Sequence, residues 1–134
     1  MDDVVLNKLS TIQRCLQRIH EEFDGDESGF RTNFTKQDSV ILNQQRACEA
    51  SIDISNVLIR QQRLGIPQSA RDSFELIEKA GVISAGLSEK LKRMVGLRNI
   101  AVHDYQALNL DIVVSVVKNH LNDFEEFSSV IAKL

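Results

Sequence analysis

Several residue types are scarce in this chain of 134 residues, and each scarcity narrows what the chain can be. One proline and six glycines leave long stretches free to be helical. No apolar run approaches the roughly 18 residues that span a bilayer, so we expect no membrane segment. The chain opens on Asp2 and Asp3, which is unlike the basic start of a signal peptide. The predicted location is therefore the cytoplasm.

Residues that bind metals are also few, with two cysteines and three histidines. Cys15 and Cys48 have neither Cys-x-x-Cys spacing nor a histidine at zinc-finger spacing, so they are predicted to be buried, reduced thiols. A di-iron bundle needs Glu-x-x-His twice, and this motif is absent, as is His-Glu-x-x-His. His20 and His120 are isolated and are interpreted as surface or boundary residues. We predict no metal site and no cofactor.

Charge is low overall but unevenly distributed. The net charge is −3, which by itself argues against tight binding to nucleic acid. The stretch from Arg60 to Arg98, however, holds eight basic and four acidic residues, so it carries +4 and the rest of the chain −7. A local excess of basic residues is compatible with a ligand that bears phosphate.

Apolar residues recur at helical spacing along most of the chain. The first stripe consists of Val5, Leu9, Ile12, Leu16, Ile19 and Phe23. This alternation of three- and four-residue steps predicts one amphipathic helix. A polar loop is predicted over 24–33, and a second long helix from about Lys36 to Leu64, where Gly65-Ile66-Pro67 ends it.

The second half of the chain predicts one short helix and two long ones. Ser69 and Asp72 resemble a capping box before a short helix that ends near Gly81. A fourth helix begins near Ser84 or Ser88, and Asn109 is the expected cap of the last helix. No alternating strand pattern competes. The prediction is therefore an all-α, up-and-down bundle of four long helices and one short helix, forming a single domain over residues 1–134.

One position in the fourth helix breaks the apolar pattern. The stripe Leu91, Val95, Arg98, Val102 has a guanidinium where its spacing calls for an apolar residue. Burying an unpaired charge is costly, so Arg98 is expected to be paired or to have a functional role. The alternative is an arginine at the edge of the core whose guanidinium extends to solvent. His103 would lie about 140° around the axis from Arg98. A straight helix cannot aim both at one ligand, so either the helix breaks near His103 or a second subunit supplies the missing partner.

The segment Arg98-Asn99-Ile100-Ala101-Val102-His103-Asp104-Tyr105 resembles the motif of the HEPN superfamily and, within it, of the HepT-type toxins. That motif is an arginine, four to six residues and a histidine, with a polar residue after the arginine and a tyrosine two residues after the histidine. Arg14 and His20 also fit the bare spacing but lack both additions. The resemblance covers essentially the whole chain in length, helix count and motif position.

The resemblance implies a metal-independent endoribonuclease, the toxin of a toxin–antitoxin pair, which forms a two-fold homodimer around one cleft. One His103 would take the 2′-hydroxyl proton of RNA and the other would protonate the leaving 5′-oxygen. Arg98 would stabilise the charge on the phosphate, and Asn99 would hold the ligand or the histidine by hydrogen bonds. The product would be a 2′,3′-cyclic phosphate.

The same resemblance implies a partner enzyme, a small nucleotidyltransferase antitoxin of the MNT type. Such an antitoxin would transfer AMP to Tyr105, and the added phosphate would neutralise Arg98 and block RNA. The chain lacks the Gly-Ser and paired-Asp motif of that enzyme, so it would be the substrate. The alternative is a non-catalytic helical module that binds the nucleotidyltransferase or a nucleotide through Arg98 and His103.

Overall fold

The structure, a computed structural model, describes residues 2–134, which are almost entirely helical. Its elements in chain order are α1 (Asp3–Phe23), α2 (Glu27–Arg31), α3 (Phe34–Gln62), α4 (Ala70–Lys79), α5 (Ala85–His103), the 3₁₀ helix η1 (Tyr105–Ala107), α6 (Leu110–Asn119) and α7 (Leu121–Ala132). No strand occurs among the described residues. The predicted all-α class is confirmed, whereas the predicted count of five helices is wrong.

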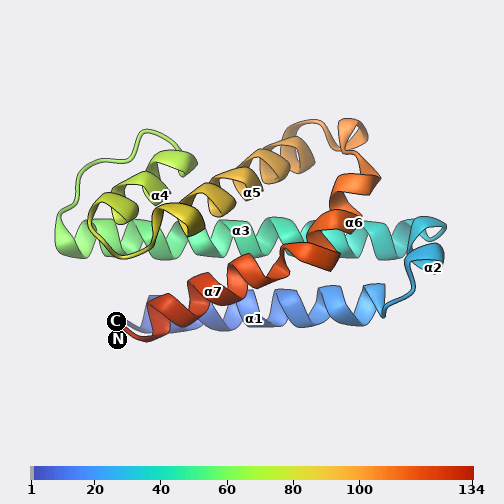
Figure 1. Cartoon of the computed structure of the whole chain (residues 1–134), viewed down its shortest axis with the longest axis horizontal. Coiled ribbons are helices and arrows are strands. Elements are labelled where there is room, and N and C mark those ends of the chain that lie inside the picture. The colour runs from blue at the N-terminus through green and yellow to red at the C-terminus, as the bar shows by residue number, and fades with distance from the viewer. Residues whose placement is uncertain (1) are drawn as a thin grey trace.

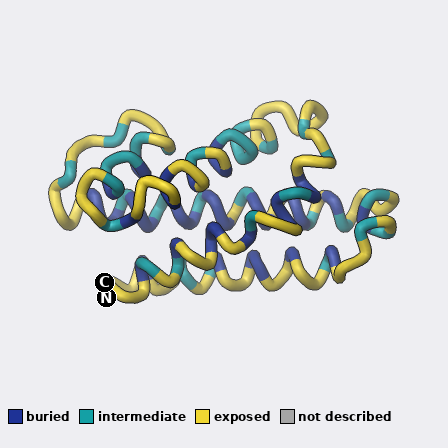
Figure 2. The backbone as a smooth tube through the Cα atoms, viewed as in Figure 1, coloured by how far each residue is buried: buried dark blue, intermediate teal, exposed yellow. Residues whose placement is uncertain are grey.

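Two long antiparallel helices, α1 and α3, form the centre of the bundle, and both chain termini lie at the same end (Figure 1). On the side of α3 away from α1 lie α4 and α5, while α7 returns along α1. The buried residues follow the inner sides of these helices (Figure 2). No helix among residues 2–134 combines the length and the hydropathy needed to cross a bilayer.

The first helix forms as the apolar stripe predicts. Its stripe residues Val5, Ile12, Leu16, Ile19 and Phe23 are all buried. A side-chain oxygen of the preceding Asp2 accepts the Val4 N–H at 2.7 Å, which satisfies one of the free donors at the helix start. The stripe therefore faces α3 across the full length of α1.

The predicted polar loop over 24–33 is wrong in part, because it contains α2. The short helix begins at a cap in which the Asp26 carboxylate accepts the Gly29 N–H at 3.0 Å. Phe30 is fully buried and its ring lies 5.2 Å from that of Phe23. The Gln37 amide of α3 donates to the Phe30 carbonyl at 3.0 Å. This single buried aromatic ring, set in a polar sequence, anchors the turn between α1 and α3.

The predicted last helix is also corrected, since it is two helices that meet at His120. In α6 four valines are buried, so this helix packs over a wide arc: Val113, Val114, Val116 and Val117. In α7 the buried rings of Phe124 and Phe127 face the bundle. A change of direction at His120 lets α6 cross the bundle while α7 follows α1 (Figure 1). Packing decided this break, because the apolar spacing continues through it.

The predicted caps of the two middle helices are confirmed. Ser69 Oγ accepts the Asp72 N–H at 3.1 Å at the start of α4, and Ser84 Oγ accepts the Leu87 N–H at 3.1 Å at the start of α5. Between these helices Gly81 adopts a φ of +80°, a left-handed conformation that glycine tolerates best. The tight turn places α4 directly against α5.

Candidate active site at the end of α5

Arg98 lies on the side of α5 that packs against α3. Leu91 and Val95, which precede it on the same stripe, are buried, and Arg98 itself is partly buried. Its Nε atom is shielded from solvent and has no hydrogen-bond partner among the described residues. An unsatisfied buried donor costs about 1–3 kcal/mol, and more when it is charged. The fold thus keeps a costly guanidinium in the position that the sequence pattern singled out.

A narrow cleft between α3 and α5 surrounds the Arg98 side chain. Gln44 and Gln45 of α3 line it opposite Arg98, together with Met94 and Leu97 of α5. The Oε1 atom of Gln44 is a second buried polar atom without a partner in residues 2–134. Both unsatisfied polar groups thus lie at one cleft of about 10 Å³, which is too small to admit a ligand in this conformation.

Cys48 of α3 lies beside Arg98, and the pKa of its thiol responds both to burial and to the guanidinium. Burial raises the pKa of the Cys48 thiol to about 12, although the positive charge of Arg98 acts in the opposite direction. Burial also raises the pKa of Cys15. Both cysteines are free and buried, as the sequence predicts. Burial thus suppresses thiolate formation at Cys48 although a guanidinium lies beside it.

His103 is the last residue of α5 and is exposed to solvent. The helix ends there because Asp104 leaves the helical conformation, with its N–H bonded to the Ile100 carbonyl at 2.8 Å. Arg98 and His103 still belong to one regular helix, so their side chains leave it about 140° apart. The helix does break at His103, as the first alternative expects, but the break comes after both residues and does not turn their side chains toward one another. A site completed by a second chain stays a prediction.

Asn99 lies between the two directions and is partly buried. At 100° per residue it points about 40° from the direction of His103. Asn99 and His103 thus share one side of α5, while Arg98 points toward α3. Within a single chain, the structure brings Asn99 and His103 to one face and leaves Arg98 on another.

Tyr105 lies just beyond the helix, in η1, and its hydroxyl donates a hydrogen bond to the Asp38 carboxylate of α3. The ring is 44% exposed and borders a cavity of about 280 Å³ between α3, η1 and α6. Burial, followed by the hydrogen bond to Asp38 and the negative charge of Asp38, raises the pKa of Tyr105 to about 12. The hydroxyl is therefore protonated at neutral pH but reachable from solvent.

Asp38 is the residue of this site that sequence reasoning missed. It lies 67 positions before Tyr105 in the chain, in the first turns of a long helix rich in polar residues. No spacing rule links it to the motif. Only the packing of η1 against the start of α3 brings the carboxylate to the tyrosine.

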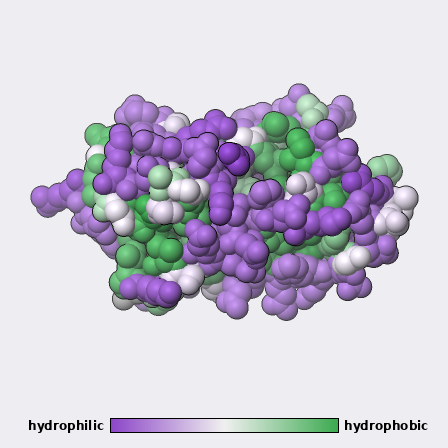
Figure 3. All heavy atoms as spheres, viewed as in Figure 1, coloured by the Kyte–Doolittle hydropathy of each residue, from purple (hydrophilic) through white to green (hydrophobic). Residues whose placement is uncertain are grey.

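Apolar surface flanks the end of α5. Ile100 and Val102 of the motif and Ile112 of α6 are each exposed by more than a third. Figure 3 shows a hydrophobic area between the end of α5 and α6, where Leu97, Ile112 and Val116 line a pocket of about 220 Å³. Val102, predicted to be on the buried stripe, is exposed instead, which corrects that prediction. Exposed apolar groups beside a candidate site are typical of a surface that contacts another protein.

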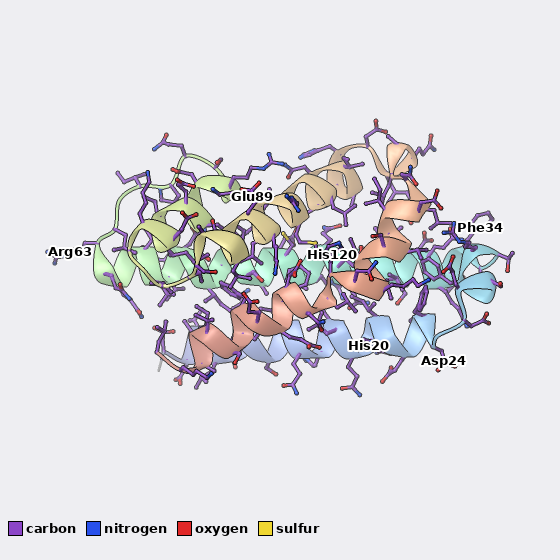
Figure 4. The ribbon with its side chains drawn as sticks, viewed as in Figure 1. His20, Asp24, Phe34, Arg63, Glu89 and His120 are labelled. Carbon is purple, nitrogen blue, oxygen red and sulfur yellow. The ribbon has the colours of Figure 1, made fainter. Side chains whose placement is uncertain are left out.

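The remaining histidines are not part of the motif. His20 is on α1, away from the end of α5, whereas His120, at the junction of α6 and α7, lines the same 220 Å³ pocket as Leu97 (Figure 4). His120 Nδ1 lies 3.5 Å from the Asp123 carboxylate, so it has a local partner. Among residues 2–134 no group of three or more His, Cys, Asp or Glu side chains is arranged to hold a metal ion.

Comparisons with known families, sequences and structures all find relatives of one kind. The model of the family described as "Ribonuclease HepT-like" matches residues 12–131. An mRNA nuclease HepT from Shewanella oneidensis is 62% identical over 131 residues, which is 98% of each chain. A crystal structure of a toxin–antitoxin with AMP-PNP contains a chain that is 59% identical, with a TM-score of 0.96 over 99% of this chain and 100% of that one.

A second solved structure carries a modification. It is a tri-AMPylated Shewanella oneidensis HEPN toxin in complex with an MNT antitoxin, 60% identical with a TM-score of 0.96, and the match covers 100% of both chains. The family model spans most of this chain, and the relatives match it along nearly its full length. The resemblance inferred from the motif is confirmed: this chain belongs to the HepT-like ribonuclease family of the HEPN superfamily.

Proposed function

We propose that this chain is the toxin of a toxin–antitoxin pair and that it cuts RNA at a site which two copies of the chain build together. The observation that carries the proposal is the placement of Arg98 and His103. Arg98 holds a buried, unpartnered Nε, and His103 leaves the same helix in another direction. A two-fold homodimer that buries the exposed apolar end of α5 would bring both copies of the motif to one cleft.

The chemistry needs only these side chains and the RNA. Neutral imidazole of one His103 accepts the 2′-hydroxyl proton while the 2′-oxygen forms a bond to phosphorus. The bond from phosphorus to the 5′-oxygen breaks, and the protonated imidazole of the other His103 donates its proton to that oxygen. Arg98 stabilises the additional negative charge on the phosphate, and Asn99 orients the ligand or a histidine. The products are a 2′,3′-cyclic phosphate and a 5′-hydroxyl.

The mechanism is proposed to be independent of metal ions, which can be tested directly. Purified protein is incubated with RNA in excess EDTA, and the ends of the fragments are identified by mass spectrometry. Cleavage is expected to persist and to leave cyclic phosphate. Arg98→Ala and His103→Ala are each expected to lower the rate by at least about 100-fold, because each removes a group that acts in the transition state.

His20→Ala is the matched control, since His20 is exposed on α1 and lies away from the site. Circular dichroism and solution mass establish that each variant folds and associates like the parent. Unchanged cleavage in both Arg98→Ala and His103→Ala would refute the site. Loss of all cleavage in EDTA would refute metal independence. Absence of any RNA cleavage would favour the alternative, a module that binds its partner without catalysis.

The cognate partner is proposed to be an MNT-type nucleotidyltransferase that modifies Tyr105. The tyrosine oxygen would attack the α-phosphate of ATP, with release of pyrophosphate and of the hydroxyl proton. Three features support this: the relative of known structure is AMPylated, Tyr105 is partly exposed, and it follows His103 closely in the chain. Added phosphate at this position would pair with Arg98 and repel RNA.

Tyr105→Phe tests this regulation. The variant is expected to cleave RNA but to escape neutralisation by the nucleotidyltransferase and ATP. Peptide mass spectrometry of the parent protein should locate AMP-sized additions on Tyr105. Labelling of another residue, or full neutralisation of Tyr105→Phe, would refute the assignment.

A further inference from the structure

A glycine on the outer side of α5 makes room for an arginine from α4. A Cβ atom built on Gly96 would lie 3.0 Å from Nη2 of Arg71, which is closer than nearly all such contacts in proteins. Arg71 lies in the first turn of α4, just after the Ser69 cap. Its guanidinium therefore rests on the α5 backbone at a position where any other residue would displace it.

Gly96 shares a row with the two solvent-side residues of the motif. Asn99 follows it by three positions and His103 by seven, which places all three on one face of the helix. The rise between Gly96 and His103 is about 10 Å along the axis. Arg71 thus extends the row of Asn99 and His103 toward the start of α5, on the side that Arg98 does not face.

The Arg71 charge forms no ion pair within the part of the chain that the structure describes. None of the ion pairs among residues 2–134 includes Arg71. By contrast, Lys92, one turn before Gly96 on the same row, is bound to Glu75 of α4. That pair joins α4 to α5, whereas the exposed guanidinium beside it stays available to a ligand.

We propose that Arg71, seated on Gly96, binds a phosphate of the RNA next to the one that is cut. This inference rests on the proposed function. Arginine suits the role because its planar fork makes paired hydrogen bonds to phosphate. Because Gly96 has no side chain, the Arg71 guanidinium can lie against α5 on the same row as His103.

Two substitutions test the contact from opposite sides. Arg71→Ala removes the charge, and Gly96→Ala keeps the charge but displaces it. Binding is measured by fluorescence anisotropy with a 2′-O-methylated oligoribonucleotide, which cannot form a cyclic phosphate and stays intact. Arg71→Ala is expected to raise Kd about tenfold at low salt, the size expected for a hydrogen-bonded charge. Gly96→Ala is expected to raise Kd by less, because the flexible Arg71 side chain need move only a few tenths of an ångström. For Arg71→Ala, the slope of log Kd against log salt should fall by about 0.7.

Matched controls separate this contact from general effects. Gly86→Ala makes the same change in the same helix, where the nearest atom is Ser84 Oγ at 4.0 Å. Arg60→Ala removes an exposed positive charge from α3. Both should bind RNA like the parent. The double variant Arg71→Ala with Gly96→Ala should be no weaker than Arg71→Ala alone, because both changes remove one contact.

The inference is overturned if Arg71→Ala binds the oligonucleotide with parental Kd and salt slope. It is also overturned if Gly96→Ala weakens binding equally with and without Arg71, or if Arg71→Ala acts by changing the solution mass. Failure of the proposed function looks different. In that case the parent protein would not cleave unmodified RNA, whatever the effect of Arg71 on binding.

Discussion

Tyr105 is the only tyrosine in a chain without tryptophan, so its ionisation can be followed in isolation by ultraviolet absorbance. We expect the folded protein to titrate at a pKa of about 12. Asp38→Asn should lower that pKa toward 10, but only in part, because burial is the largest cause of the shift. Asp104→Asn, next to Tyr105 in the chain, should leave it in place. Equal pKa values for the parent and Asp38→Asn would contradict the contact.

The raised pKa of Tyr105 also makes the free energy of unfolding depend on pH. The pKa of Tyr105 is higher in the folded state than in the unfolded state, so the folded protein holds the hydroxyl proton more tightly. The contribution is therefore complete below pH 10 and is lost as the pH rises toward 12. Urea unfolding of the parent and Tyr105→Phe over this range should show a steeper decline for the parent. Identical declines would contradict the linkage.

Arg98 should contribute to function at the expense of stability. Arg98→Leu replaces a partly buried guanidinium, whose Nε has no hydrogen-bond partner among residues 2–134, with an apolar side chain on an apolar stripe. We expect the free energy of unfolding to be unchanged or to rise by about 1 kcal/mol, while RNA cleavage is lost. Urea denaturation and the cleavage assay measure the two effects. A loss of more than about 1 kcal/mol would mean that the guanidinium holds α3 and α5 together.

At the scale of elements, the capping of α4 matters because Arg71 lies in the first turn of this helix. Ser69 Oγ accepts the Asp72 N–H at 3.1 Å, and the Asp72 carboxylate accepts the Gln68 N–H at 2.9 Å. Ser69→Ala removes the first bond and is expected to destabilise the protein by about 1 kcal/mol. Thermal and urea unfolding measure the change, with Ser129→Ala on the exposed side of α7 as the control. Equal stability of both variants would show that the cap is dispensable.

The sequence predicts helices correctly where an apolar stripe is long, as in α1, or where capping residues are explicit, as in α4 and α5. Prediction failed where one buried ring or one change of direction decided the outcome. Phe30 turns a polar segment into α2 because it packs on Phe23, which local sequence does not reveal. The break at His120 follows from the need of α6 and α7 to cover different parts of the bundle. In both places tertiary packing overrode local pattern.

At the scale of the whole molecule, the proposed site depends on two chains. A tagged heterodimer of one parent subunit and one His103→Ala subunit distinguishes the possible arrangements. If both histidines serve one scissile phosphate, the heterodimer should lose nearly all cleavage, because either the base or the acid is missing. If each chain acted alone, about half of the activity would remain, and the shared site would be refuted. Solution mass verifies that the heterodimer is intact.

The sequence by itself determined the helical class, the family and the positions of the candidate site residues. Helical stripes and capping residues are local, and Arg98, Asn99, His103 and Tyr105 lie within one short segment. The tertiary structure alone decided which groups from distant segments meet that segment. Asp38 reaches Tyr105 from α3, and Arg71 reaches Gly96 from α4. Such contacts depend on how the helices pack and on which side each presents, and no local spacing encodes them.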